Sequence, residues 1–156
     1  IFTIDFPQNI TQVHFIKLRL FDTKGKEVAN TFYWRSNDKY EGRKTLTGPT
    51  SSGFEDLSKL KQVQLKTRYQ TYQEGDRHFI KAEIKNPSST VAFFTQLQLL
   101  GQDKKPVRPS FYTDNFFSLL PGESKTVIIE TAASDMPSEP TFVVKGWNIK
   151  PSSFKL

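Results

Sequence analysis

The sequence predicts an all-β protein, an immunoglobulin-like antiparallel β-sandwich preceded by a partial β-sheet segment. Apolar and polar residues alternate along residues 61–71, as in a strand with one buried and one wet face. Turn residues recur at intervals of roughly 8 to 12 positions after this point, which favours about seven short strands, here without the cysteine pair.

The clearest turn is formed by Leu120, Pro121, Gly122 and Glu123. Proline fixes φ at the second position of a turn, and glycine supplies the positive φ that a type II turn requires at its third position. A β-branched run follows the turn and an aromatic segment precedes it. The pattern predicts a hairpin-like unit at the centre of the sandwich.

The pattern of residues 1–36 predicts three strands. The first is the apolar start of the chain, and it ends at Pro7, which cannot donate to a ladder. Three strands cannot close a sandwich, so their apolar side chains need a cover. We expect residues 1–36 to dock onto the later sandwich or to pair with the same segment of another copy, which would give a dimer.

Residues 37–58 predict a polar linker that ends in a short helix. Ser52 and Glu55 have the spacing of a capping box, and apolar residues follow on one side of the helix. Residues 59–150 predict the complete sandwich, and 151–156 a tail. The expected core includes Val91, Phe93, Leu97, Leu99, Phe116, Leu119 and Leu120.

Composition excludes several classes of function. The 156-residue chain has a formal net charge of +6, but its lysines and arginines are scattered along strands, so we expect no nucleic-acid partner. No apolar run approaches the roughly 20 residues of a membrane span, so we expect no membrane contact. With no cysteine, and with His14 and His78 isolated from each other, we expect no metal and no cofactor.

The sequence also offers no catalytic residue. Acid-base cleavage of a glycosidic bond needs two carboxylates about 5 to 10 Å apart, one with a raised pKa. The acidic residues lie mostly in predicted turns or on the wet sides of strands, and no pair stands out. Ser124 lacks the Gly-x-Ser-x-Gly context of a nucleophile, and no glycine-rich phosphate loop occurs.

Four residues remain as candidates for a carbohydrate or domain contact: Tyr112, Asp114, Asn115 and Trp147. The first three belong to an aromatic and polar cluster that could place a ring beside hydrogen-bonding groups. The alternative, which the pattern favours, is that neighbouring rings fill the core while Asp114 and Asn115 bond local backbone. We expect Trp147 to pack in the core and leave Tyr112 open between the two roles.

Four segments together resemble a known family. They are VHFIKLRLFDTKGKEVANTFYWRS (13–36), SSTVAFFTQLQLL (88–100), PVRPSFYTDNFFSLLPGES (106–124) and VVKGWNI (143–149). In this order they resemble the C-terminal end of glycoside hydrolase family 2 enzymes, in the exo-β-glucosaminidase and endo-β-mannosidase branch.

The resemblance implies that residues 1–36 are closing strands of a preceding immunoglobulin-like domain and that 59–150 are the final one. The family's catalytic carboxylates lie in a (β/α)8 barrel that no segment here matches, so no catalytic residue carries over. The implied function is a non-catalytic domain that supports this barrel in an enzyme acting on β-mannosides or β-glucosaminides. Its implied partners are the barrel and the preceding sandwich of the same polypeptide, and an oligosaccharide.

A periplasmic or extracellular location in a bacterium goes with the same resemblance. Two alternatives stay open at this point. The chain could be a carbohydrate-binding β-sandwich that uses the aromatic cluster, or an adhesion or interaction domain. An exposed row of aromatic rings would favour the first alternative.

Overall fold

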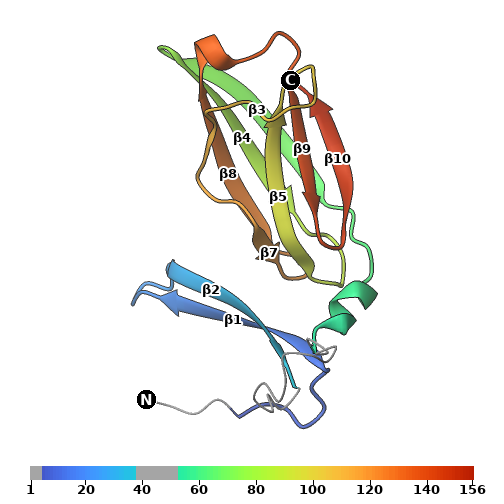
Figure 1. The fold of residues 1–156 in the computed structure, drawn as a ribbon. Coiled ribbons are helices and arrows are strands. Elements are labelled where there is room, and N and C mark those ends of the chain that lie inside the picture. Colours follow the sequence, from blue (N-terminus) through green and yellow to red (C-terminus); the bar gives the residue numbers. More distant parts are fainter. Residues whose placement is uncertain (1–4, 38–52) are drawn as a thin grey trace, which may run out of the picture. The chain divides into compact units, whose positions relative to one another are not determined.

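The computed structural model describes residues 5–37 and 53–156, which fall into two compact units, Ile1–Leu60 and Lys61–Leu156 (Figure 1). The predicted linker after Asn37 lies outside the described residues, as do Ser52 and the first four residues of the chain. The assignment of residues 1–36 to a preceding domain stays a prediction.

The first unit contains an antiparallel hairpin of β1 (Val13–Phe21) and β2 (Glu27–Ser36). The Asp22 carboxylate closes its turn by accepting hydrogen bonds from the N–H groups of Lys24 and Lys26, each at 2.9 Å. The third predicted strand is not found in the described residues 5–7, which have no strand pairing. Proline at position 7 cannot donate to a ladder, and the Phe6 ring instead lies edge-on to His14 at 5.7 Å.

The predicted helix exists as a short 3-10 helix, η1 (Glu55–Lys59), with Leu57 buried. Its N-cap residue is Phe54, which makes no side-chain capping bond. A second 3-10 turn, η2 (Ala133–Asp135), lies in the second unit between β8 (Ser124–Ala132) and β9 (Thr141–Gly146). Among residues 5–37 and 53–156 no helix has the length and apolarity that a membrane crossing requires.

The second unit is the predicted sandwich, and its all-β, antiparallel, immunoglobulin-like fold is confirmed (Figure 1). One sheet has the strand order β3-β4-β8-β6, with β3 (Lys66–Glu74), β4 (Arg77–Lys85), β8 (Ser124–Ala132) and β6 (Phe111–Tyr112). The other has the order β10-β9-β5-β7, with β10 (Ile149–Lys155), β9 (Thr141–Gly146), β5 (Ala92–Leu100) and β7 (Phe117–Leu119).

The core lies between these two sheets and follows from the alternation in the sequence. On β4, Ile80, Ala82 and Ile84 are buried, whereas the intervening Lys81 and Glu83 are exposed. The facing sheet contributes Leu97, Leu99, Phe142 and Val144 to the same apolar cluster. Burial of these aliphatic and aromatic groups is the main favourable term in the stability of such a fold.

The turn Leu120–Glu123 has the predicted local geometry but a different role. Gly122 has φ +80°, and the Glu123 N–H donates to the Leu120 carbonyl at 3.1 Å, as in a type II turn. However, β7 and β8 on its two sides belong to different sheets, so the predicted hairpin is wrong and the turn carries the chain across the sandwich. The Glu123 carboxylate fixes this corner by accepting the Leu120 N–H at 2.9 Å.

Asn86 joins this corner to the neighbouring loop. Its side chain is fully buried and donates to the carbonyls of Thr90 (2.8 Å) and Leu119 (3.0 Å). Its backbone N–H donates to Glu123, and its carbonyl accepts from Gly122, both at 2.9 Å. Two loops that are far apart in the sequence are therefore held together by one residue.

Five of the last six residues, 151–155, which were expected as a tail, form most of β10, an edge strand. The Phe154 ring packs on Phe142 at 5.8 Å and on Tyr69 at 5.5 Å, which anchors the strand to the core. Pro151 is compatible with this position because an edge strand tolerates a residue without an N–H.

Replacing Gly122 by alanine should lower the free energy of unfolding by about 1 kcal/mol, because a Cβ is penalised at positive φ. No atom lies within 4 Å of the added Cβ, so backbone strain is the expected cause. Chemical denaturation measures the change. Gly122→Asn is the matched control and should cost less, since asparagine adopts the left-handed region more readily; equal stability of all three proteins would contradict the assigned turn.

Candidate functional site

Tyr112 has both an apolar and a polar role in the sandwich. Its ring packs against the core cluster, and its hydroxyl oxygen accepts the Leu99 N–H of β5 at 3.0 Å. Burial raises the pKa of Tyr112, and the bond from Leu99 offsets part of this rise. The phenol therefore stays neutral and serves as a hydrogen-bonding partner for a strand edge.

The Asn115 side chain takes the place of a neighbouring strand's backbone as the hydrogen-bonding partner of β5. Its side-chain carbonyl accepts the Leu97 N–H at 2.8 Å, and its amide donates to the Leu97 carbonyl at 3.1 Å. The pattern is that of a backbone pair in an antiparallel ladder. Leu97 is thereby satisfied where β7, which pairs with β5 at Ala92 and Thr95, no longer reaches.

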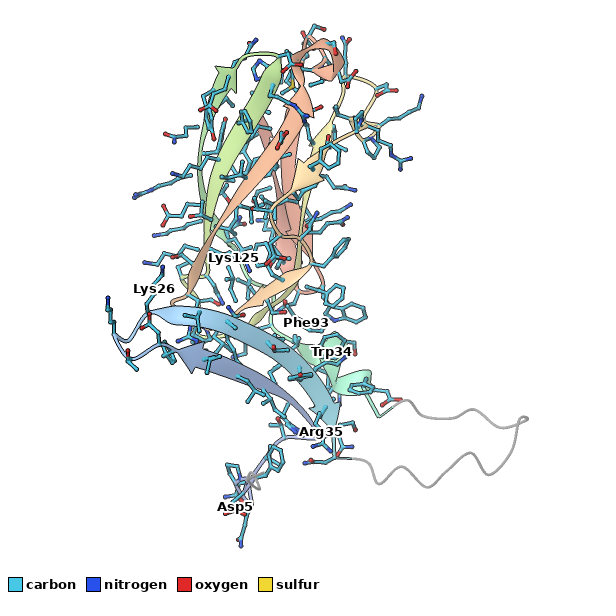
Figure 2. The ribbon with its side chains drawn as sticks, turned by 90° about the vertical axis from the view of Figure 1, so that its left-hand side faces the viewer. Asp5, Lys26, Trp34, Arg35, Phe93 and Lys125 are labelled. Carbon is cyan, nitrogen blue, oxygen red and sulfur yellow. The ribbon has the colours of Figure 1, made fainter. Side chains whose placement is uncertain are left out.

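Asp114 bonds locally, as expected from the sequence, and also reaches across to β8. Its carboxylate accepts the Asn115 N–H at 2.7 Å and forms an ion pair with Lys125, which is labelled in Figure 2. The Lys125 ammonium also lies 5.2 Å from the centre of the Phe117 ring. A half-exposed pair of this kind contributes little to stability, and it links the segment before β7 to β8.

Phe116, expected in the core, is 51% exposed and has φ +57°. The reason is the direction set by its neighbours: Asn115 is bound to β5, and Phe117 and Leu119 point inward. Phe116 therefore points outward, where its ring lies 5.8 Å from that of Phe94, which is also at positive φ. Bulky residues in this backbone region are uncommon.

The two-residue turn between β9 and β10 explains the Gly-Trp-Asn motif. A Cβ on Gly146 would lie 2.8 Å from the Phe94 carbonyl oxygen, so only glycine lets this turn approach β5. Asn148 is buried and accepts the Phe93 N–H at 2.9 Å. It also donates to the carbonyls of Val91 (2.8 Å) and Lys61 (2.9 Å).

Trp147 is 60% exposed, and the prediction that it packs in the core is wrong. Its neighbours determine this outcome, since Gly146 must face β5 and the Asn148 side chain must point inward. The Trp147 backbone still takes part, because its N–H donates to the Phe93 carbonyl at 3.0 Å. The indole therefore lies on the surface, on a turn whose backbone and Asn148 side chain are hydrogen-bonded to β5.

Of the four candidate residues, three lie on one segment that crosses from β6 towards β7, and Trp147 lies on the turn after β9. Tyr112 and Asn115 use their polar atoms on β5, and Asp114 uses its carboxylate on Lys125. These roles are structural. A contact of the four residues with carbohydrate or with another domain stays a prediction.

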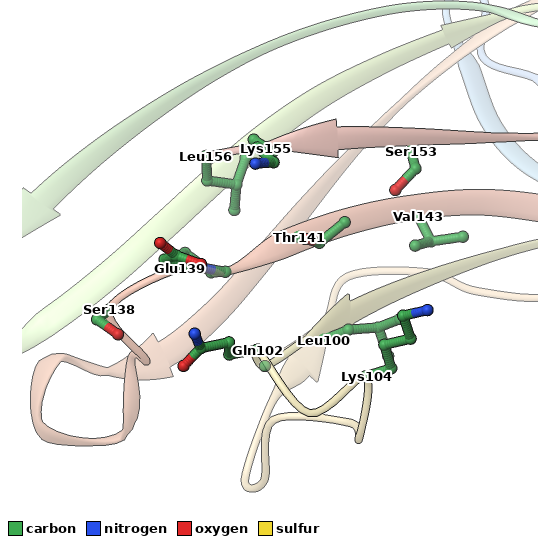
Figure 3. A pocket seen from close by; sticks show the side chains of 12 residues that line it. Leu100, Gln102, Lys104, Ser138, Glu139, Thr141, Val143, Ser153, Lys155 and Leu156 are labelled. Atoms are coloured by element: carbon green, nitrogen blue, oxygen red, sulfur yellow. The ribbon is translucent and has the colours of Figure 1, made fainter.

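The sequence did not point to a groove that lies over β9 and β10. It has a volume of about 510 Å³, and Figure 3 shows it from close by, with Thr141 and Val143 on its floor and Lys104 on the loop after β5. Two ammonium groups, Lys104 and Lys155, and one carboxylate, Glu139, share its lining with amide and hydroxyl groups. No aromatic ring lines it. The groove can form hydrogen bonds but offers no face for stacking.

The described residues contain no group of three or more histidine or acidic side chains that could hold a metal ion. Several carboxylates are paired with cations: Asp56 with Lys59, Asp103 with Lys105, and Glu130 with Arg77. Hydrogen bonds from Lys105 hold the pKa of Asp103 below its usual value, which is opposite to what a catalytic acid needs.

A family model and two curated relatives that match the chain share one description, exo-beta-D-glucosaminidase. A family model described as the exo-beta-D-glucosaminidase Ig-fold domain matches residues 45–149. An exo-beta-D-glucosaminidase of Streptomyces avermitilis is 30% identical over 149 residues, which cover 89% of this chain and 16% of that protein. An exo-beta-D-glucosaminidase of Amycolatopsis orientalis is 27% identical over 157 residues, which cover 94% of this chain and 15% of that protein.

Solved structures agree with this fold. The exo-chitosanase CsxA of Amycolatopsis orientalis superposes with a TM-score of 0.80 at 24% identity, over 98% of this chain and 19% of CsxA. A CsxA complex with PNP-beta-D-glucosamine gives a TM-score of 0.83 at 22% identity. The chain thus spans less than a fifth of the length of the relatives that it matches.

Replacing Asn148 by alanine should lower the free energy of unfolding by about 2 kcal/mol or more, because buried backbone groups of β5 lose their partner. Trp147→Ala, one residue away, should cost about 1 kcal/mol or less, since the indole is mostly exposed. Thermal and urea unfolding of both variants tests the assignment. A larger loss for Trp147→Ala than for Asn148→Ala would contradict it.

Proposed function

The chain belongs to the exo-β-D-glucosaminidase Ig-fold domain family, and from this we propose that it serves as a non-catalytic accessory domain of a larger family 2 glycoside hydrolase. The parent enzyme would release glucosamine from β-linked amino-sugar chains, as the names of its relatives indicate. The observation that carries the proposal is the match of one domain family to residues 45–149, in relatives several times longer than this chain.

The chemistry of the described residues supports an accessory role. Hydrolysis of a glycosidic bond requires a proton donor and a second carboxylate placed around one sugar. Here the carboxylates of Asp114 and Glu130 are each paired with a cation, and polar groups that could orient a sugar, such as the Asn115 amide, are used on β5. The catalytic pair of the parent enzyme would therefore lie elsewhere in its sequence, on the barrel that the family resemblance implies.

In this role the domain contributes a rigid surface. The corner at Gly122, the Asn86 contacts and the Gly-Trp-Asn turn hold one end of the sandwich in a single arrangement. The exposed Trp147 indole is a suitable contact for the barrel or the preceding sandwich of the parent polypeptide, because aromatic side chains are enriched at such interfaces. We further propose a periplasmic or extracellular location in a bacterium, since a polysaccharide substrate does not cross a membrane.

The 156-residue chain should not hydrolyse PNP-β-D-glucosamine, whereas the full-length parent enzyme should. Release of nitrophenol measures both activities under the same conditions. Turnover by the 156-residue chain that survives repurification, and that disappears when Glu130 or Glu139 is changed to glutamine, would overturn the accessory role.

In the full-length enzyme, Asn148→Ala should lower the temperature at which activity is lost, because it loosens the sandwich without touching the catalytic pair. The kcat/KM for PNP-β-D-glucosamine at low temperature should stay within about twofold of the original value. A large fall in kcat with an unchanged melting temperature would mean that this turn takes part in the catalytic site itself.

A further inference from the structure

A row of four side chains crosses the sheet β3-β4-β8-β6 on the face that points away from the core. Tyr72 is opposite Phe79, Phe79 is opposite Glu130, and Glu130 is opposite Phe111. Residues directly opposite one another in antiparallel strands share a face. The adjacent residues Ile80, Ile129 and Tyr112 lie on the core side, which places the row on the outer side.

The row contains three aromatic rings and one carboxylate; Tyr72 and Phe79 are half-buried and Phe111 is exposed. Tyr72 and Phe79 are stacked, with centres 5.0 Å apart and planes inclined by 12°. Phe111 is 58% exposed and lies two strands beyond Phe79, a separation of roughly 10 Å at the usual strand spacing. Between them, one oxygen of Glu130 accepts a hydrogen bond from Arg77 at 2.5 Å, which holds the carboxylate in place.

The row lies at the acidic end of the outer face. Glu74 and Asp76 lie beside it and, with Glu130, outnumber the two nearest cations on β4, Arg77 and Lys81, which occupy the outward-facing positions before and after Phe79. The other end of the face carries a basic set with one acidic residue: Lys66, Arg68, Lys85 and Glu83. A positively charged ligand would therefore be attracted to the end that carries the rings.

We propose that Tyr72, Phe79, Glu130 and Phe111 form a surface binding site for a β-linked glucosamine oligosaccharide. The choice of this sugar rests on the proposed function. Aromatic faces stack on the C–H groups of a pyranose, and a protonated amino group is attracted both to a ring face and to a carboxylate. The second oxygen of Glu130 can accept a hydrogen bond from that ammonium while the first stays bound to Arg77.

Other parts of the surface fit this ligand less well. The groove over β9 and β10 carries two lysines against one glutamate and has no ring. The Phe94 and Phe116 rings form a pair whose nearest acidic residue in sequence, Asp114, is already paired with Lys125. Of these three surfaces of the described residues, the row alone combines rings, a paired carboxylate and a local excess of negative charge. A site of this kind would keep a polymer close to the parent enzyme between cleavage events, which raises its effective concentration.

Isothermal titration of the 156-residue chain with glucosamine oligosaccharides tests the proposal, at a pH where the amines are protonated. Phe111→Ala and Tyr72→Ala should each weaken binding by about tenfold, because each removes one stacking face. Phe116→Ala is the matched control, since its ring is similarly exposed but lies outside the row, and it should leave binding within about twofold. Melting temperatures of all variants confirm that each is folded.

A second comparison tests the carboxylate. The original protein should bind glucosamine oligosaccharides more tightly than their N-acetylated counterparts, and Glu130→Gln should remove most of this difference. Absence of binding by the original protein, an equal loss in Phe116→Ala and Phe111→Ala, or unchanged binding in both ring variants of the row would each overturn the site. Because binding is measured without turnover, failure here counts against the site alone, and lack of activity in the parent enzyme counts against the proposed function alone.

Discussion

The buried side-chain amide of Asn148 is the contact on which the arrangement of the sandwich depends. It satisfies the Phe93 N–H and the carbonyls of Val91 and Lys61, and so joins the start of β5, the segment that leads into β3 and the turn between β9 and β10. Buried backbone groups without partners are costly, and no ladder reaches these groups. Asn115 does the same for Leu97 further along β5, so side-chain amides complete the sheet where strands do not.

The fold could be predicted from the sequence because its signals are local. Alternation identified β4 and β5, and proline and glycine chemistry identified the turn at Gly122. That chemistry sets φ within the turn but not which sheet receives the next strand, so the crossing between sheets was missed. The position of Trp147 was missed for a related reason: its direction depends on the close approach of Gly146 to β5, which joins residues about fifty positions apart.

The motifs that carry the family resemblance have structural roles in the domain. Two glycines allow backbone geometries that a side chain would hinder, and two asparagines satisfy backbone groups of β5; they are Gly122, Gly146, Asn115 and Asn148. None of the four is placed to cleave a bond. This division agrees with an accessory domain whose catalytic partner lies elsewhere in the polypeptide. The aromatic row on the outer face could not be predicted, because it is created by the register of four strands that are not consecutive in the sequence.

Native-state hydrogen exchange at the Phe93 and Leu97 amides tests most directly whether side-chain amides act as strand partners in this protein. Each N–H donates to an asparagine side chain, Asn148 and Asn115 respectively. If these contacts are as firm as a ladder, both amides should exchange only through global unfolding, as slowly as the central amides of β4 and β8. Exchange of Phe93 and Leu97 through local opening, at a rate typical of loop amides, would contradict the account.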